Sequence, residues 1–142
     1  MAHSNEATPW RMLVEPMNPR RILVVEDDAL LGMLLAETLG GLGHEVCAIA
    51  ATEADAVAEA ARHDPNLMIV DVNLGNGSGI VAVRYILGAR FIPHIFMSGD
   101  ISRVREHYPD AVMLRKPFKE AVLIHAIQRA VEADAPGWVT PS

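Results

Sequence analysis

Short apolar runs alternate with segments of helical periodicity through the middle of the chain. Five runs have the length and composition of strands buried in a sheet: Ile22–Val25, Val46–Ile49, Leu67–Val72, Ile95–Met97 and Ala111–Leu114. Five segments have helical spacing: Ala29–Leu42, Glu53–His63, Ile80–Leu87, a short stretch around Ile101–Tyr108, and Glu120–Ala133. A Gly-rich loop is predicted over Asn73–Gly79.

This alternation predicts an α/β protein with an open, doubly wound, five-stranded parallel sheet. Right-handed crossovers leave few topologies, and strand order 2-1-3-4-5 is the favoured one. In such sheets functional groups lie beyond the carboxyl ends of the strands, at the switch between the first and third strands. We therefore expect the functional residues at that edge of the sheet.

The two ends of the chain differ from its centre. Residues 1–20 contain three prolines and no sustained periodicity, so they are predicted to form an N-terminal arm. Residues 21–133 form the predicted domain, and residues 134–142 a C-terminal tail. Trp10 and Trp138 lie in the two arms, where each could pack loosely on the domain or stay exposed; the sharper hypothesis is that they help form a homodimer or partner surface.

Composition narrows the classes of partner. Hydrophobic residues make up 51% of the 142, which fits a globular protein. Acidic residues outnumber basic ones 18 to 12, which argues against nucleic acid or an anionic membrane as the main partner. The single cysteine fits a reducing compartment, and the polar N-terminus does not resemble a secretory signal. A cytoplasmic location is the expectation.

Polar groups follow four of the predicted strands. These groups are Glu26-Asp27-Asp28 after the first strand, Asp71 and Asn73 after the third, Ser98-Gly99 after the fourth, and Lys116-Pro117 after the fifth. Carboxylates brought together at one edge repel one another unless a cation compensates. The natural compensators are a hard divalent cation such as Mg²⁺, which prefers oxygen ligands, and an ammonium group.

Each of these signals has a simpler explanation when taken singly. The acids after the first strand could cap the first helix, and Asp28 is expected to do so. Ser98-Gly99 alone is a turn signal, and a lone Asp after a strand is often a loop residue. The combination of suitable groups at four strand ends is what favours a functional site.

The chain over about residues 20–133 resembles the receiver domain of bacterial two-component response regulators. The matching segments are Ile22–Asp28, Ile69–Asn73, Met97-Ser98-Gly99 and Leu114–Phe118. The resemblance implies a flavodoxin-like fold and a phosphoryl group accepted on Asp71 from a histidine kinase or a histidine phosphotransfer protein. It implies a stand-alone signalling protein with an unidentified downstream protein target, or a phosphate shuttle or sink, and no enzyme activity beyond self-phosphorylation and self-dephosphorylation.

The resemblance also assigns roles to individual residues. Asp71 is the expected nucleophile. Mg²⁺ is expected to be held by Asp71, by Asp27 directly, by Glu26 through water and by the backbone carbonyl of Asn73. Ser98 is expected to bond the phosphoryl group and Lys116 to pair with it, with a cis bond between Lys116 and Pro117.

Three features depart from the usual receiver pattern. The interval from Ser98 to Lys116 is short, so the fourth helix should be shortened. Phe96–Gly99 resembles the Phe-Ala-Thr-Gly motif of an alphaproteobacterial subgroup. Met113 stands where many receivers carry a switching aromatic residue, and Gly75 replaces a common proline, which should loosen the loop around it.

The same residues bear on three other functions. A flavin mononucleotide electron carrier needs a phosphate-cradling loop after the first strand, where this chain has carboxylates. A small aspartyl-phosphate phosphatase typically needs a second acid at the position of Asn73. A receiver-like binding module that is never phosphorylated stays open as an alternative.

Overall fold

A computed structural model describes residues 19–133, apart from the side chain of Arg103. The arms that contain Trp10 and Trp138 lie outside the described residues, so the predicted arm surfaces stay predictions. Five parallel strands form one sheet: β1 (Arg21–Val25), β2 (Glu45–Ala50), β3 (Leu67–Asp71), β6 (His94–Ser98) and β7 (Val112–Arg115). Their order is β2-β1-β3-β6-β7, which confirms the predicted topology.

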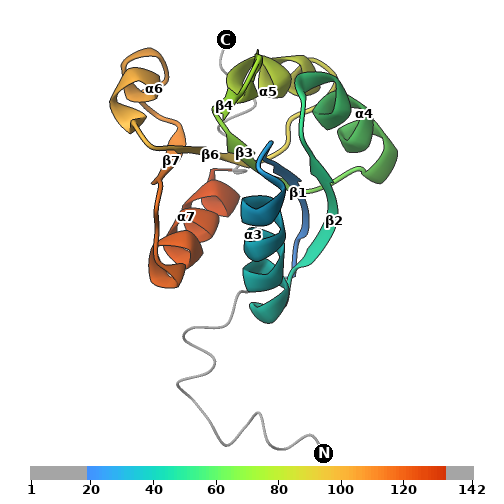
Figure 1. Cartoon of the computed structure of the whole chain (residues 1–142), viewed down its shortest axis with the longest axis vertical. Helices are drawn as coiled ribbons and strands as arrows, with labels where there is room; N and C mark the ends of the chain where they lie inside the picture. Colours follow the sequence, from blue (N-terminus) through green and yellow to red (C-terminus); the bar gives the residue numbers. More distant parts are fainter. Residues whose placement is uncertain (1–18, 134–142) are drawn as a thin grey trace, which may run out of the picture.

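Helices cover both faces of this sheet (Figure 1). They are α3 (Ala29–Gly41), α4 (Glu53–His63), α5 (Gly79–Leu87), α6 (Ile101–His107) and α7 (Glu120–Glu132). Helices α3 and α7 lie on one face, and α4, α5 and α6 on the other. The predicted shortening of the fourth helix is confirmed, because α6 has only 7 residues.

The strand sequences explain this two-sided packing. Successive side chains of a strand point to opposite faces, so Ile22 and Val24 pack with α3 and α7, whereas Leu23 and Val25 pack with α4 and α5. All four are fully buried. A continuous apolar run is therefore what a strand covered on both faces requires.

The helices begin where the sequence supplies caps. Asp28, Thr52, Ser78 and Asp100 cap α3, α4, α5 and α6, each by accepting a backbone N–H in the first turn. Asp64 ends α4 in a left-handed conformation, with Pro65 after it. None of the helices within residues 19–133 is long and apolar enough to cross a lipid bilayer.

The predicted Gly-rich loop over Asn73–Gly79 contains regular structure that the prediction did not include. The segment forms a two-stranded antiparallel hairpin, β4 (Asn73–Leu74) with β5 (Gly77–Ser78). Gly75 has a φ of 70°, the left-handed conformation that glycine adopts without steric cost. The Gly75-Asn76 pair is thus a hairpin turn, and it lies directly beside the carboxyl end of β3.

Candidate functional site

The acids after β1 take separate roles. The N–H of Glu26 donates to the carbonyl of Ala50 at 2.9 Å, which extends the pairing with β2 by one residue and buries Glu26 to 4% exposure. Asp27 is exposed, and Asp28 caps α3 by accepting from Leu30 at 3.0 Å. Helix capping therefore explains Asp28 but does not explain Glu26 and Asp27.

Asp71 is the last residue of β3 and is buried. Its Oδ1 accepts the N–H of Asn73 at 2.9 Å. The close approach of α5 fixes the backbone here, since the N–H of Gly79 donates to the carbonyl of Val72 at 2.9 Å. A Cβ on residue 79 would lie 2.0 Å from the Asp71 carbonyl oxygen, so only glycine fits. The aspartate is thus held in one orientation from both sides.

Lys116 joins the two acids. It follows β7 directly, and its N–H donates to the carbonyl of Ser98 at 2.8 Å. Its Nζ donates to Glu26 Oε1 at 3.0 Å and to Asp71 Oδ2 at 2.7 Å. Residues up to 90 positions apart along the chain therefore share one ion-pair network. The structure thus brings together three of the residues named from the sequence as site residues, and their roles stay predictions.

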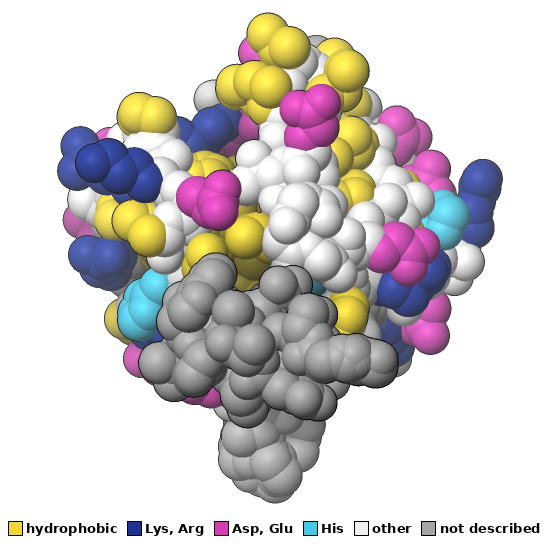
Figure 2. Space-filling model, turned by 90° about the horizontal axis from the view of Figure 1, so that it is seen from below, with side chains coloured by type: hydrophobic (Ala, Val, Ile, Leu, Met, Phe, Trp, Pro, Cys, Tyr) yellow, Lys and Arg dark blue, Asp and Glu magenta, His cyan; other side chains and the backbone are white. Residues whose placement is uncertain are grey.

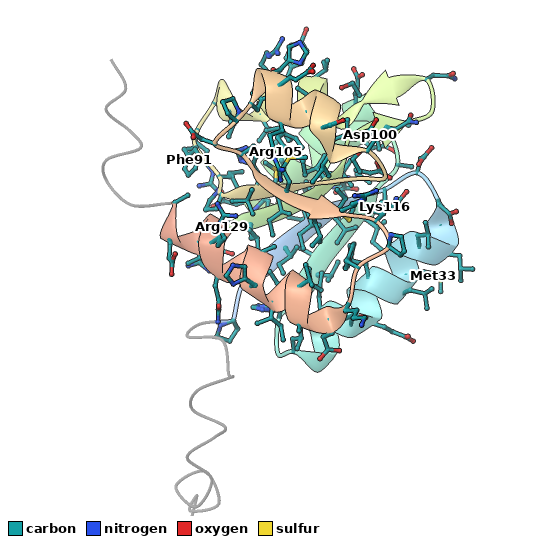
Figure 3. The ribbon with its side chains drawn as sticks, turned by 90° about the vertical axis from the view of Figure 1, so that its left-hand side faces the viewer. Met33, Phe91, Asp100, Arg105, Lys116 and Arg129 are labelled. Atoms are coloured by element: carbon teal, nitrogen blue, oxygen red, sulfur yellow. The ribbon has the colours of Figure 1, made fainter. Side chains whose placement is uncertain are left out.

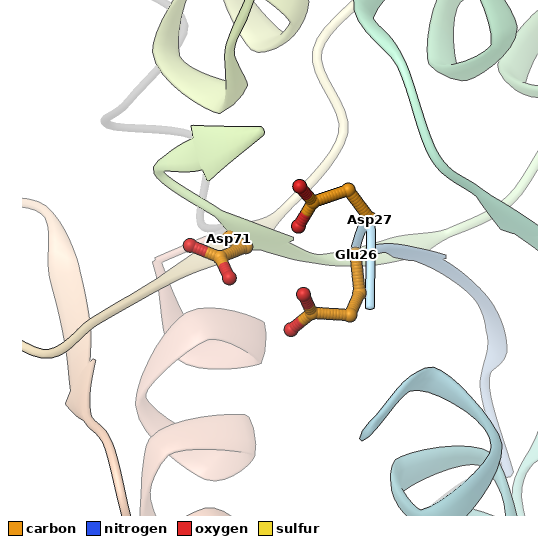
Figure 4. Close-up of side chains that lie close together, drawn as sticks. All are labelled: Glu26, Asp27 and Asp71. Carbon is orange, nitrogen blue, oxygen red and sulfur yellow. The ribbon is translucent and has the colours of Figure 1, made fainter. Parts of the chain in front are cut away.

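Three carboxylates face one another at this edge of the sheet. The side chains of Glu26 and Asp27 turn toward Asp71 (Figure 4), and one oxygen of each lies within 4.8 Å of the others. Hydrogen bonds already engage both oxygens of Glu26, because Oε2 accepts the N–H of Asp28 at 3.1 Å and Oε1 accepts from Lys116. Within residues 19–133 no hydrogen bond engages the Asp27 carboxylate, and a Cβ on Gly75 would come within 3.2 Å of Asp27 Oδ2, so glycine leaves room there.

Burial and neighbouring charge perturb this cluster. Burial raises the pKa of Glu26, the Asp71 carboxylate raises it further, and the N–H of Asp28 and the Lys116 ammonium offset only part of the rise. Burial lowers the pKa of Lys116, but its hydrogen bonds to Asp71 and Glu26 outweigh that effect, so the pKa is raised. The ammonium is therefore firmly charged at neutral pH. Counted at their formal charges, the three carboxylates and this one ammonium carry a net charge of about -2.

The donor set fits a divalent magnesium ion. Mg²⁺ binds oxygen and is held in proteins by one or two carboxylates together with waters. Asp27 is the exposed carboxylate of the three, and Asp71 faces it. Both border an open hollow of about 1010 Å³, which Asn73 also lines. The net formal charge of the three carboxylates and the ammonium is opposite and equal to the charge of one such ion.

Ser98 lines the same hollow, and its hydroxyl is bonded to the backbone of Asp100. Its hydroxyl donates to the carbonyl of Asp100 at 3.0 Å and accepts the N–H of Asp100 at 3.1 Å. Both bonds belong to the turn that leads into α6. Ser98 thus borders the hollow from the turn before α6, with its hydroxyl engaged by that turn.

Sequence reasoning missed the support for the hairpin. Glu53 Oε2, at the start of α4, accepts the N–H of Ser78 at 2.6 Å and so ties the hairpin to the neighbouring helix. The Gly75-Asn76 pair is a sequence signal from which the hairpin could have been predicted. The Glu53 contact has no such local signal, because it depends on tertiary packing.

Sequence reasoning also missed two residues of the hollow. His107 and Tyr108, at the end of the short α6, line it together with the acids.

Comparison with known proteins agrees with the site. The profile of the response regulator receiver domain matches residues 22–128. The chain therefore belongs to the receiver domain family of two-component response regulators. The match lies within residues 21–133, the predicted domain.

Individual relatives give the same family. The chain is 38% identical over 117 residues to the transcriptional regulatory protein PdtaR of Mycobacterium tuberculosis. The aligned region covers 80% of this chain and 57% of PdtaR. It is 34% identical over 114 residues to the phyllosphere-induced regulator PhyR of Methylorubrum extorquens, covering 78% of this chain and 43% of PhyR. The chain thus spans about half the length of these curated relatives.

Solved structures share the fold. The solution structure of the receiver domain of Erythrobacter litoralis PhyR superposes with a TM-score of 0.76 at 31% identity, covering 84% of this chain and 96% of that domain. The crystal structure of PhyR from Brucella abortus gives a TM-score of 0.78 at 29% identity, covering 86% of this chain and 51% of PhyR. The finer assignment to the alphaproteobacterial motif subgroup stays a prediction.

Proposed function

We propose that this chain is a response-regulator receiver that accepts a phosphoryl group on Asp71 and signals by docking to another protein, or by passing the group on. The observation that carries the proposal is the contact of Lys116 with both Asp71 and Glu26, beside the carboxylate of Asp27. A cation already set against a buried, oriented carboxylate is what phosphoryl transfer needs, because that reaction depends mainly on positioning and charge neutralisation.

The proposed step has a simple balance. An oxygen of the Asp71 carboxylate attacks phosphorus, and the bond from phosphorus to the donor's nitrogen or oxygen breaks. The donor leaves with the electron pair of that bond, and an acyl phosphate remains on Asp71. Hydrolysis returns the carboxylate and releases inorganic phosphate.

The side chains divide the work of this step. Lys116 Nζ donates to Asp71 Oδ2. After the transfer, its compact positive charge can pair with an oxygen of the phosphoryl group on Asp71. Bound Mg²⁺, for which we propose Asp27, Asp71, the Asn73 carbonyl and, through water, Glu26 as the holding groups, would supply neutralisation of the phosphoryl charge. Ser98 would rotate away from Asp100 to bond the new oxygens.

We propose a histidine kinase or a histidine phosphotransfer protein as the donor, docking over α3. This helix exposes Leu30, Met33 and Leu34 at 63%, 61% and 49%. Met33 points away from the body of the protein in Figure 3, and hydrophobic side chains gather on the face seen in Figure 2. An apolar groove of about 490 Å³ between α3 and α7 is also lined by Glu26 and Lys116, so it joins the acid site. A protein that brings a phosphohistidine to Asp71 would cover this surface.

The other functions receive less support. A flavin phosphate at the end of β1 would meet the carboxylates of Glu26 and Asp27 in place of free backbone donors. No observation favours a module that is never phosphorylated. Incubation with acetyl phosphate and Mg²⁺, followed by intact mass measurement, tests the proposal. We expect one added phosphoryl group, absent in Asp71→Asn and abolished by a chelator, whereas equal labelling of Asp71→Asn would overturn it.

A further inference from the structure

The hairpin of β4 and β5 contacts the acid site on one side and α4 on the other. The N–H of Asn73, in β4, donates to Asp71 Oδ1 at 2.9 Å. The N–H of Ser78, in β5, donates to Glu53 Oε2 at 2.6 Å. Asn73 and Ser78 are paired with each other across the hairpin. The two contacts therefore hold one pair of residues from opposite sides.

The pairing pattern also fixes the direction of the Asn73 carbonyl. In an antiparallel ladder, pairs that exchange hydrogen bonds alternate with pairs whose backbone polar groups point away from the partner strand. Asn73 and Ser78 form a pair of the second kind, because their N–H groups donate to Asp71 and Glu53. The Asn73 carbonyl, which we propose as a Mg²⁺ ligand, therefore lies on the edge of β4 that meets Asp71.

Glycine allows Glu53 to lie against the hairpin. A Cβ on Gly77 would come within 2.9 Å of Glu53 Oε2 and 3.1 Å of Glu53 Cγ, so the side chain could not keep its place beside any larger residue. At the turn, a Cβ on Gly75 would lie 3.2 Å from Asp27 Oδ2. The hairpin thus packs closely against Glu53 at one point and against Asp27 at another. A movement of the hairpin away from α4 would change the space beside the Asp27 carboxylate.

Glu53 has a simpler explanation as an acid in the first turn of α4. Acidic side chains are stabilising near the N-terminus of a helix, and Asp55 stands in the same turn. That explanation accounts for the charge of Glu53 but not for its contact, since Oε2 accepts a backbone N–H from a residue 25 positions away. Thr52 already caps the helix by accepting the N–H of Asp55. The hairpin contact therefore needs an explanation of its own.

We propose that Glu53 is a positioning residue for Mg²⁺ binding, which holds the hairpin so that the Asn73 carbonyl is directed toward the site of Asp27 and Asp71. Mg²⁺ requires near-ideal octahedral geometry, so a displaced carbonyl lowers its affinity. Removal of a group that orients a metal ligand typically weakens metal binding about 10- to 100-fold. The inference rests on the proposed Mg²⁺ site and adds to it a residue of α4, a helix that supplies none of the proposed ligands.

Calorimetric titration of the protein with Mg²⁺, with no phosphoryl donor present, tests this role. Glu53→Ala should weaken Mg²⁺ binding about tenfold, because the hairpin loses its contact with α4. Glu53→Gln keeps an oxygen that can accept the N–H of Ser78, so it should keep most of the affinity. Asp55→Ala is the matched control, since it removes an exposed carboxylate from the same helical turn, and it should leave the affinity unchanged.

Gly77→Ala tests the same contact from the hairpin side. The new Cβ would displace the Glu53 side chain, so Mg²⁺ binding should weaken in the parent. In a Glu53→Ala background the same substitution should cost little further affinity, because the side chain that it displaces is absent. Protection of the Ser78 amide from hydrogen exchange should be lost in Glu53→Ala and kept in Glu53→Gln. Circular dichroism establishes that each variant is folded.

Three results would overturn the inference. The first is equal Mg²⁺ affinity of the parent and Glu53→Ala, and the second is the absence of Mg²⁺ binding by the parent. The third is an equal loss in Glu53→Ala and Glu53→Gln, because this would mean that the negative charge of Glu53 matters and its contact with the hairpin does not.

Labelling by acetyl phosphate is measured separately from Mg²⁺ affinity. A parent protein that is labelled on Asp71, with Glu53 variants that bind Mg²⁺ as the parent does, would refute the role of Glu53 and leave the proposed function standing. Weaker Mg²⁺ binding by Glu53→Ala, with no labelling of the parent, would support the role of Glu53 and contradict the phosphoacceptor assignment.

Discussion

Lys116 Nζ lies 2.7 Å from Asp71 Oδ2, although the two residues come from strand ends that are not adjacent in the sheet. The contact brings an ammonium onto a carboxylate that is buried and already held by the N–H of Asn73. The same ammonium also neutralises Glu26. It therefore has two functions, to offset repulsion in the resting protein and to stand beside the carboxylate that we propose as the phosphoacceptor.

Removal of the ammonium should destabilise the protein. In Lys116→Met, Glu26 and Asp71 keep their burial and lose their common partner, so the free energy of unfolding should fall by about 2 kcal/mol in the presence of a chelator. Mg²⁺ should restore part of that loss, because it compensates the same carboxylates. Urea denaturation with and without Mg²⁺ measures both effects.

Lys119→Met provides the matched control, since Lys119 is the other lysine of the chain and is exposed at the start of α7. It should change the free energy of unfolding little. Equal stability of the two variants in chelator would show that the Lys116 contacts contribute nothing.

A methyl group at residue 79 should disturb the acid site through the backbone. In Gly79→Ala the new Cβ would meet the carbonyl oxygen of Asp71 at 2.0 Å and Val70 Cγ1 at 2.6 Å, so α5 must move away from β3. The free energy of unfolding should fall by about 1–3 kcal/mol, as is usual for overpacking. Phosphorylation by acetyl phosphate should also slow, because the end of β3 is displaced.

Gly40→Ala gives the opposite expectation within the same protein. Gly40 lies inside α3, and a Cβ there meets nothing within 4 Å. The substitution should raise the free energy of unfolding by about 0.5–1 kcal/mol, since alanine loses less backbone entropy in a helix. A similar loss for both variants would mean that the space around Gly79 is not what restricts it.

Ser98 should matter for the response and little for stability. Among the described residues its hydroxyl bonds only the backbone of Asp100, so Ser98→Ala should leave the free energy of unfolding nearly unchanged. Phosphorylation should still occur, but the amide chemical-shift changes of α6 on phosphorylation should be lost. Ser98→Thr keeps the hydroxyl and should keep them. Identical chemical-shift changes in the alanine variant would show that the Ser98 hydroxyl is not needed for the response of α6 to phosphorylation.

Acid should weaken the junction between the first two strands through His44. Burial lowers the pKa of His44 and the nearby Arg20 lowers it further, and Nδ1 accepts the N–H of Arg20 at 3.0 Å, which requires the neutral ring. The folded pKa lies below the unfolded value of 6.5, so the stabilisation is fully present above pH 6.5 and is lost as the pH falls through the folded pKa.

Replacement of His44 tests this sign. His44→Asn keeps an acceptor that does not titrate, so its free energy of unfolding should fall less between pH 7.5 and pH 5 than that of the parent, by about 1 kcal/mol. His94, whose pKa burial also lowers, is common to both proteins and cancels in the comparison. Parallel pH profiles would contradict the role assigned to His44.

Much of this architecture could be predicted from local pattern. The apolar runs that became β1 and β3 are buried on both faces, and that burial is why they show no alternation. The short interval before Lys116 predicted the shortened α6 because the number of residues limits the length of a helix. The placement of acids and lysine at one edge followed from strand direction alone.

Other features depend on contacts that no local pattern encodes. Glu53 reaches Ser78 across 25 residues, and the apolar side chains of α3 look like core residues in sequence although Met33 is 61% exposed. Ser98 shows how far the sequence can predict the site. Its residue type and position suggested that its hydroxyl bonds the phosphoryl group, whereas its observed partner is Asp100. Which state of a rotatable hydroxyl is populated depends on the charge present in the pocket, and sequence alone does not show it.

The identity of the acceptor can be read chemically. The protein is incubated with acetyl phosphate and Mg²⁺, reduced with borohydride, which converts an aspartyl phosphate to homoserine, and digested for tandem mass spectrometry. We expect homoserine at residue 71 and at none of the neighbouring acids Glu26, Asp27 or Asp28. Homoserine at another position, with Asp71 recovered intact from protein that carries the phosphoryl group, would contradict the assignment of Asp71 as the nucleophile.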